Sequence, residues 1–179
     1  MKSLAALSLA PALALAMTAA PALADHRAEG EVTVTPTMPL PADAVWKHSF
    51  DAYEGEKGEE NGAISRALWF VKTMGEHGVD EARAKSAVVI HGPSVFDVVK
   101  DARYAAKYGE GEDGAPARNP NHNNVAELIA RGGEIWVCGV SAKHHKVGDE
   151  DLLPGVRMAP AAMIAHADLQ RRGFSLNPY

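Results

Sequence analysis

The chain has 179 residues, of which 46% are hydrophobic, and a formal net charge of −5 at pH 7. This length and composition suit a single domain with a full hydrophobic core. The mildly acidic charge includes no large basic cluster, which argues against nucleic-acid binding and against binding to an anionic membrane surface.

The first 24 residues have the pattern of a secretory signal peptide. Lys2 supplies the positive charge, residues 4–16 are mostly apolar, and Ala22-Leu23-Ala24 provides the small residues of a cleavage site. The apolar segment is too short for a convincing membrane span, and nothing else in the chain could cross a bilayer. We therefore expect cleavage after Ala24, export to the periplasm and no stable membrane insertion.

Residues 25–44 are predicted to form an extended arm because of their high proline content. The globular domain is expected over residues 45–179. Its first predicted elements are a strand at 45–50 and, after a polar loop, a helix at 61–77. Asn61 has a side chain suited to cap the start of that helix.

The middle of the chain alternates between apolar runs and helical patterns. Residues 86–90 form a compact run rich in β-branched residues, which is typical of a central parallel strand. A helix is predicted at 95–108, followed by a long loop at 109–124 that is rich in Gly, Pro and Asn. Loops of this length are usually functional or disordered. A further helix is predicted from residue 125 to about 132.

The last third of the chain continues the alternation. A strand is predicted at 134–138, followed by a short basic helix, a strand at 156–158, a helix at 160–172 and a final strand at 174–176. This order predicts a three-layer, doubly wound α/β fold in which helices cover both faces of a mostly parallel, five-stranded sheet.

Two chemically interesting residues, His91 and Cys138, each stand at the end of a predicted strand. Ligand sites of such sheets form beyond the carboxyl ends of the strands, so both residues are expected at the same edge. Cys138 is the only cysteine, so it cannot form an internal disulfide; it is either a reactive thiol or a small buried residue. His91 could hydrogen-bond or deprotonate the thiol, or it could satisfy a loop carbonyl.

A basic turn follows Cys138, consisting of Lys143, His144, His145 and Lys146. Ser141 could cap the helix, and the cations are then expected in its first turns, where they oppose the helix macrodipole. Such a locally unfavourable arrangement of charge is typical of a functional site. The cations would lower the pKa of the thiol and attract anionic sulfur species; the alternative is a solvated surface turn.

Metal binding is not favoured by the histidines. His122, His144 and His145 have none of the spacings typical of zinc sites, and there is no CxxC motif. His77 and His166 lie in predicted helices and are expected at the surface or in packing. No metal and no other cofactor is therefore expected.

Several segments occur in a characteristic order along the chain. They are His91-Gly92-Pro93, Ile135-Trp136-Val137-Cys138, the short basic helix, Asp151-Leu152-Leu153-Pro154-Gly155, Pro160 and the closing segment 169–174. Together they resemble the DsrE/DsrF-like (YchN-like) sulfur relay family, in its exported branch, over roughly residues 45–178. The resemblance implies a small doubly wound α/β domain that assembles into homotrimers or homohexamers. It also implies that Cys138 carries a persulfide.

The chain departs from that family pattern in two respects. Export would separate it from the cytoplasmic members, which pass sulfur in tRNA thiolation or sulfur oxidation. His144-His145-Lys146 also stands where many relatives carry an arginine-rich turn ending in glycine, a part that Gly148 could take here.

The function predicted from these observations is a periplasmic sulfur-binding or sulfur-transfer protein that holds sulfane sulfur as a persulfide on Cys138. It would be a carrier rather than a turnover enzyme, and its partners would be small sulfur species or a protein donor or acceptor. One alternative is a non-catalytic ligand-binding or assembly module of the same fold. Another is a metal binder that uses Cys138, His91 and His144 or His145.

Overall fold

The computed structural model describes residues 34–41 and 43–177. Residue contacts divide the chain into a unit at 1–38 and a compact unit at 39–179. The predicted signal peptide and the beginning of the predicted arm lie outside the described residues. The described part of the arm before residue 45 contains no helix or strand. Within the described ranges, no helix is both long and apolar enough to cross a membrane.

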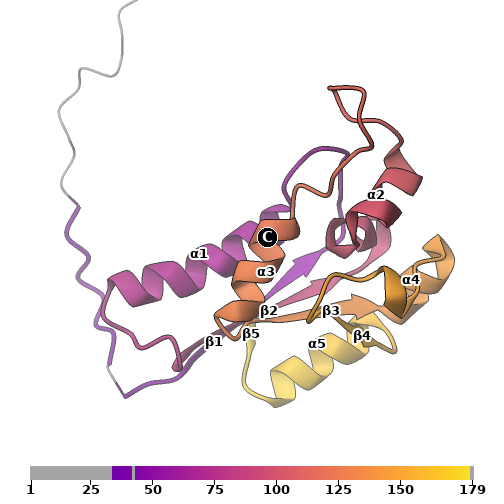
Figure 1. Cartoon of the computed structure of the whole chain (residues 1–179). Coiled ribbons are helices and arrows are strands. Elements are labelled where there is room, and N and C mark those ends of the chain that lie inside the picture. Colours follow the sequence, from indigo (N-terminus) through magenta and orange to yellow (C-terminus); the bar gives the residue numbers. More distant parts are fainter. Residues whose placement is uncertain (1–33, 42, 178–179) are drawn as a thin grey trace, which may run out of the picture. The chain divides into compact units, whose positions relative to one another are not determined.

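Five parallel strands form one sheet in the order β4-β3-β2-β1-β5 (Figure 1). The strands are β1 Trp46–Ala52, β2 Ala84–Ile90, β3 Glu134–Cys138, β4 Arg157–Ala159 and β5 Ser175–Asn177. The central strand β2 is almost entirely buried, as its run of β-branched residues predicts. The predicted five-stranded α/β sheet is confirmed, and each of its strand pairs is parallel.

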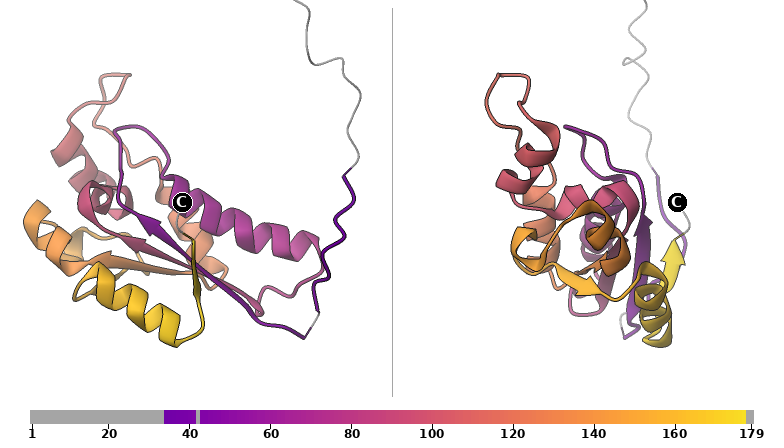
Figure 2. Two further views of the ribbon diagram at one scale, coloured as in Figure 1. Left: turned by 180° about the vertical axis from the view of Figure 1, so that it is seen from behind. Right: turned by 90° about the vertical axis from the view of Figure 1, so that its right-hand side faces the viewer.

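Helices cover both faces of the sheet (Figures 1 and 2). The helices are α1 Gly62–Glu76, α2 Asp101–Tyr108, α3 His122–Ala130, α4 Gly139–His145 and α5 Ala162–Arg171, with short 3-10 helices η2 Gly92–Val98 and η3 Asp149–Asp151. Helices α1 and α3 pack together on one face, whereas α5 crosses the other face against β2, β3, β4 and β5. The predicted N-cap is confirmed, because the Asn61 side chain accepts hydrogen bonds from the N–H groups of Ala63 and Ile64.

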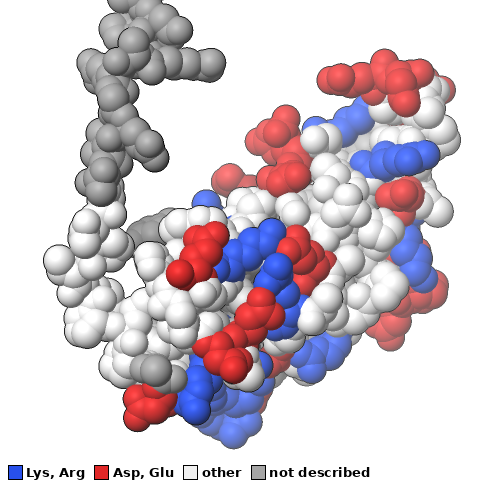
Figure 3. All heavy atoms as spheres, turned by 60° about the vertical axis from the view of Figure 1, so that its left-hand side comes forward, with Lys and Arg blue, Asp and Glu red and all other residues white. Residues whose placement is uncertain are grey.

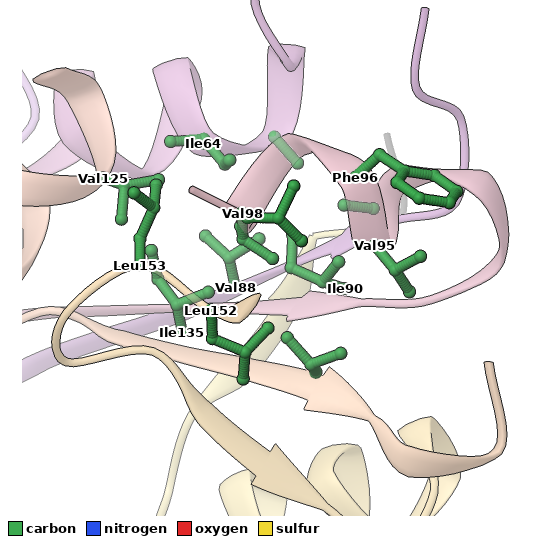
Figure 4. Packing of buried hydrophobic residues seen from close by; sticks show 14 of the residues in the cluster. Ile64, Val88, Ile90, Val95, Phe96, Val98, Val125, Ile135, Leu152 and Leu153 are labelled. Carbon is green, nitrogen blue, oxygen red and sulfur yellow. The ribbon is translucent and has the colours of Figure 1, made fainter. Parts of the chain in front are cut away.

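The two faces carry hydrophobic cores of different size. The larger core joins the sheet to α1, α3 and η2 through residues such as Ile64, Val88 and Val98 (Figure 4). The smaller core lies under α5 and is built around Val89 and Leu169. Because α5 is the main element covering this second face, the face also accommodates polar side chains of β1 such as Asp51.

The predicted helix at 95–108 is interrupted. The segment begins as η2, and Val99 and Lys100 then adopt extended backbone before α2 starts. Val99 forms an antiparallel bridge with Leu152, and the N–H of Lys100 donates to the carbonyl of Asp151 at 2.8 Å. Because the backbone of Val99 and Lys100 pairs with residues 151 and 152, it cannot form the hydrogen bonds of a continuous helix. The predicted loop at 109–124 is also shorter, because α3 begins at His122.

Charged side chains of both signs alternate on the face shown in Figure 3. On α3, Glu127 pairs with Lys72 of α1 and with Arg131, the C-cap residue of α3. These hydrogen bonds and charges lower the pKa of Glu127. The alternation prevents a large field of one sign on this face.

Asp97 is a fully buried acid at the junction between η2 and the loop before α1. Its Oδ2 atom accepts a hydrogen bond from Nδ2 of Asn61 at 2.7 Å, whereas Oδ1 has no partner. Burial raises the pKa of Asp97 to about 7, and the bond from Asn61 opposes this shift only in part. The folded protein therefore favours the protonated acid.

This buried acid predicts a pH-dependent stability. Because the pKa of Asp97 is raised from 3.8 to about 7, its contribution to stability is complete below pH 3.8 and is lost as the pH rises through 7. Between these limits, Asp97→Asn is expected to gain up to about 4 kcal/mol in free energy of unfolding relative to the wild type. Denaturant titration at several pH values measures this difference.

The exposed Asp149→Asn serves as a control, and its difference from the wild type should stay nearly constant with pH. A difference for Asp97→Asn that is equally constant would contradict the assignment.

Candidate functional site

Cys138 ends β3 and occupies the N-cap position of α4. Its thiol is free, and the residue is 5% exposed. It pairs in register with Ala159, the last residue of β4, just before the connection to α5. A Cβ atom on Gly139 would lie 2.8 Å from the carbonyl oxygen of Ala159, so only glycine allows this approach. The N-termini of α4 and α5 therefore meet at the sulfur.

Four hydrogen-bond donors surround the sulfur. They are the hydroxyl of Ser141 and the backbone N–H groups of Ser141, Ala162 and Val140. The Oγ atom of Ser141 also accepts a hydrogen bond from the N–H of Gly92 at 2.9 Å. Because that bond uses an acceptor lone pair, the hydroxyl proton of Ser141 remains available to the sulfur.

These donors determine the ionisation of the thiol. Burial alone raises the pKa of Cys138, but the hydrogen bonds from Ser141, Ala162 and Val140 together outweigh it, so that the pKa is lowered. The site therefore stabilises a thiolate by main-chain and hydroxyl donors.

The basic turn lies at the opposite end of α4 from the thiol. Lys143, His144 and His145 occupy the last turn, and Lys146 caps the helix in a left-handed conformation. The prediction that these cations oppose the macrodipole was wrong, because α4 is too short and they lie at its favourable C-terminal end. The hydrogen-bond donors, rather than these cations, lower the pKa of the thiol.

His145 packs against the domain instead of facing the sulfur. Its ring lies 5.4 Å from that of Phe96, and Arg103 donates to its carbonyl oxygen at 3.0 Å. Burial and the nearby charges of His144, Lys107 and Arg103 lower the pKa of His145.

His91 continues β2 in extended conformation and pairs with an acid. Its Nε2 atom lies 3.0 Å from each carboxylate oxygen of Asp51, and its ring lies 5.1 Å from that of Tyr53. The following Gly92 has a φ of +60°, and a Cβ atom there would lie 2.6 Å from the Tyr53 ring. The turn that fixes His91 thus requires glycine.

His91 and Cys138 lie on one face of the sheet at one edge. Val89 pairs with Trp136, and both belong to the core under α5. Since side chains alternate along a strand, the residues two positions later, His91 and Cys138, project from the same face. His91 is nevertheless not among the groups that hydrogen-bond to the sulfur.

Sequence reasoning missed two residues of this edge, Asp51 and His166. The Nε2 atom of His166, on α5, lies 2.7 Å from Oδ1 of Asp51. The expectation that His166 is a surface or packing residue overlooked this contact. The alternation of Lys47, Ser49 and Asp51 in β1 was the available signal, because it puts a carboxylate at a strand end.

The two histidines keep Asp51 ionised. Burial alone raises the pKa of Asp51, but the hydrogen bonds and charges of His91 and His166 outweigh it, so that the pKa is lowered. The carboxylate thus joins a residue after β2 to one on α5.

Residues 34–41 and 43–177 contain no group of three or more His, Cys, Asp and Glu side chains arranged to hold a metal ion. His122, one of the histidines considered above, lies 4.0 Å from Oδ1 of Asp101, away from β3. The geometry gives no support to the metal-binding alternative among the described residues.

Three exposed apolar side chains lie next to the backbone donors of the thiol in the sequence. Val140 itself donates its N–H to the sulfur, Met163 and Ile164 follow the donor Ala162 along α5, and the three residues are 64%, 77% and 51% exposed. Ile164 also lines a hollow of about 270 Å³ beside Trp136 and Pro160. We call Val140, Met163 and Ile164 the apolar rim.

The Ser141 hydroxyl can be tested separately from the backbone donors. Ser141→Ala removes one donor to the thiolate, so the pKa of Cys138 should rise. A hydrogen bond to a charged group contributes about 1.5 kcal/mol, which predicts a roughly tenfold slower alkylation at neutral pH. Alkylation rates measured across a pH series check this, with the half-buried Ser65→Ala on α1 as control. An unchanged pH dependence in Ser141→Ala would contradict the assigned donor.

The family comparison agrees with this architecture. The model of the DsrE/DsrF-like family matches residues 53–177.

No curated protein matches the chain. A solved protein of unknown function, MTH1491 from Methanobacterium thermoautotrophicum, is similar in fold, with 17% identity, a TM-score of 0.50, and coverage of 74% of this chain and 97% of that one. The ychN protein from E. coli aligns with 14% identity and a TM-score of 0.45, over 74% of this chain and 100% of that one. Because the family model covers most of the domain, this chain belongs to the DsrE/DsrF-like family.

Proposed function

We propose that this protein is a sulfur carrier in which the thiolate of Cys138 accepts sulfane sulfur and holds it as a persulfide. The observation that carries the proposal is the set of four hydrogen-bond donors on a buried sulfur at the carboxyl edge of the sheet. A purely structural cysteine needs no such set of donors. Membership of a family with a sulfur relay fold supports the same chemistry.

The transfer step is a thiol exchange. The thiolate of Cys138 attacks the outer sulfur of a donor persulfide, a new S–S bond forms, and the S–S bond of the donor breaks. The electron pair leaves with the donor thiolate, which takes up a proton. The reverse reaction with an acceptor thiol unloads the carrier, so the cycle needs no external oxidant or reductant.

The surroundings of the thiol support delivery by or to another protein as well as by small sulfur species. The apolar rim offers exposed contact area, and the exposed Lys143 and His144 on the same short helix attract anionic donors. Export to the periplasm through residues 1–24 is part of this proposal. There the sulfur would come from a periplasmic donor.

Mass spectrometry of the intact purified protein tests the proposal. After incubation with a small-molecule persulfide or polysulfide, the wild type should gain the mass of one or more sulfur atoms, and a reductant should remove it. Cys138→Ser should gain none, because the chain has no other cysteine. Absence of adducts on the wild type, or equal adducts on Cys138→Ser, would rule the carrier function out.

A second candidate is a non-catalytic assembly module, which the low exposure of Cys138 favours. In that case the thiol of the native protein would label slowly, and labelling would accelerate only on unfolding. Titration with a thiol reagent in the native and unfolded protein distinguishes the two functions.

We also propose that the protein forms homotrimers or homohexamers. Trp69 on α1 and Met163 on α5 are 67% and 77% exposed, and their burial between copies would be favourable. Light scattering should give the mass of three or six chains. Trp69→Gln and Met163→Gln, measured in parallel, should each weaken assembly if the corresponding helix face lies between copies. A monomeric wild type would contradict the proposal.

A further inference from the structure

A cluster of three polar side chains lies beside Cys138 and has no part in activating it. Asp51 comes from β1, His91 follows β2, and His166 belongs to α5. The Nε2 atoms of His91 and His166 lie 3.0 Å and 2.7 Å from Oδ1 of Asp51. We call these three residues the His–Asp–His cluster.

The hydrogen-bond pattern locates the protons of the cluster. Because the pKa of Asp51 is lowered, its carboxylate is ionised and can only accept hydrogen bonds. Both Nε2 atoms must therefore carry hydrogens that point to Asp51. Any further proton has to bind at the Nδ1 atom of His91 or of His166.

The two Nδ1 atoms differ in their surroundings. The Nδ1 atom of His166 is buried without a partner, so a proton there would bury an unpaired N–H group, at a cost of about 1–3 kcal/mol. The His91 side chain is 26% exposed, and its Nδ1 atom is not among the buried unpaired atoms of the described residues. The geometry therefore leaves Nδ1 of His91 as the accessible atom from which a proton can be transferred.

The fold places His91 at the same edge of the sheet as the sulfur of Cys138. Ile90 pairs with Val137, so the following residues, His91 and Cys138, are level on neighbouring strands. Ala162 donates its N–H to the sulfur, and His166 follows it by four residues, which puts both on one side of α5. The Ser141 hydroxyl ties the backbone after His91 to the sulfur site.

We propose that His91 is a general acid that protonates the thiolate leaving group when Cys138 attacks a donor, and that Asp51 and His166 are positioning residues. This inference rests on the proposed sulfur exchange. As the S–S bond of the donor breaks, the electron pair moves to the leaving sulfur, and that sulfur takes the proton from Nδ1 of His91. The neutral His91 then regains a proton from water.

The groups that face His91 suit this role. Asp51 holds the ring by accepting the hydrogen bond from Nε2, which leaves Nδ1 for proton transfer, and the Tyr53 ring packs against it. His166 competes for the same carboxylate from α5, and Cys138 lies on the neighbouring strand. Since the sulfur is activated by other donors, the proton of His91 is not consumed in lowering the pKa of the thiol.

Leaving-group dependence tests the inference directly. Two disulfides with matched carboxylates are compared, one with a nitro-substituted aryl thiolate as leaving group and one with an alkyl thiolate. An aryl thiolate leaves well without a proton, whereas an alkyl thiolate is more basic and benefits from a general acid. The single cysteine ensures that both reactions report on Cys138.

His91→Gln should slow the alkyl reaction roughly 100-fold and leave the aryl reaction within about twofold of the wild type. Asp51→Asn and His166→Gln should show the same selectivity with smaller losses. In the wild type, the ratio of alkyl to aryl rates should fall as the pH rises, whereas in His91→Gln it should be independent of pH. His122→Gln breaks a comparable exposed pair with Asp101 and should change neither rate.

Equal losses with both disulfides in His91→Gln would overturn the inference, because they would indicate a structural role. A wild type that reacts with neither disulfide would overturn it as well. Failure of the carrier function itself has a different signature, namely no sulfur adduct from persulfide while the leaving-group effect of His91 persists.

Discussion

The parallel alignment of the strands is the constraint on which the site depends. All strand pairs run in one direction, so the segments that follow β1, β2, β3 and β4 emerge at one edge. At that edge, the helix after Cys138 and the helix after β4 both present unpaired N–H groups, as every helix start does. The sulfur of Cys138 receives those groups from both helices. The same geometry sets His91 level with it, and Asp51 level with Val89, two positions earlier.

The different covering of the two faces explains why a charged cluster can exist so close to the core. The face with α1 and α3 holds most of the large apolar side chains, so it leaves no room for ionised groups. The other face is covered mainly by α5, and its core is small. Asp51 and His166 can therefore remain partly solvated while they hold each other in place. Two contrasting environments, an apolar core and a partly exposed polar cluster, thus lie on opposite sides of one sheet.

Much of the fold followed from the sequence because its signals are local. The apolar run of β2, the cap at Asn61 and the strand ending at Cys138 are each encoded within a few residues. The break between η2 and α2 was not predictable in this way, since it depends on pairing of Val99 with Leu152, which lies far along the chain. The residues of the site show the same difference between local and long-range signals. Cys138 and the turn at His91 could be found from position, whereas the contact between Asp51 and His166 joins residues 115 positions apart.

Three of the four donors to the sulfur are main-chain N–H groups, those of Val140, Ser141 and Ala162. Main-chain donors persist when side chains change, provided that the backbone at Gly139 keeps its close approach to β4. The side chains of the apolar rim can therefore diverge without altering the electronic state of the thiol. Substitutions at the exposed surface and changes of the backbone at Gly139 would thus have separable effects, because only the latter would change how readily the sulfur ionises.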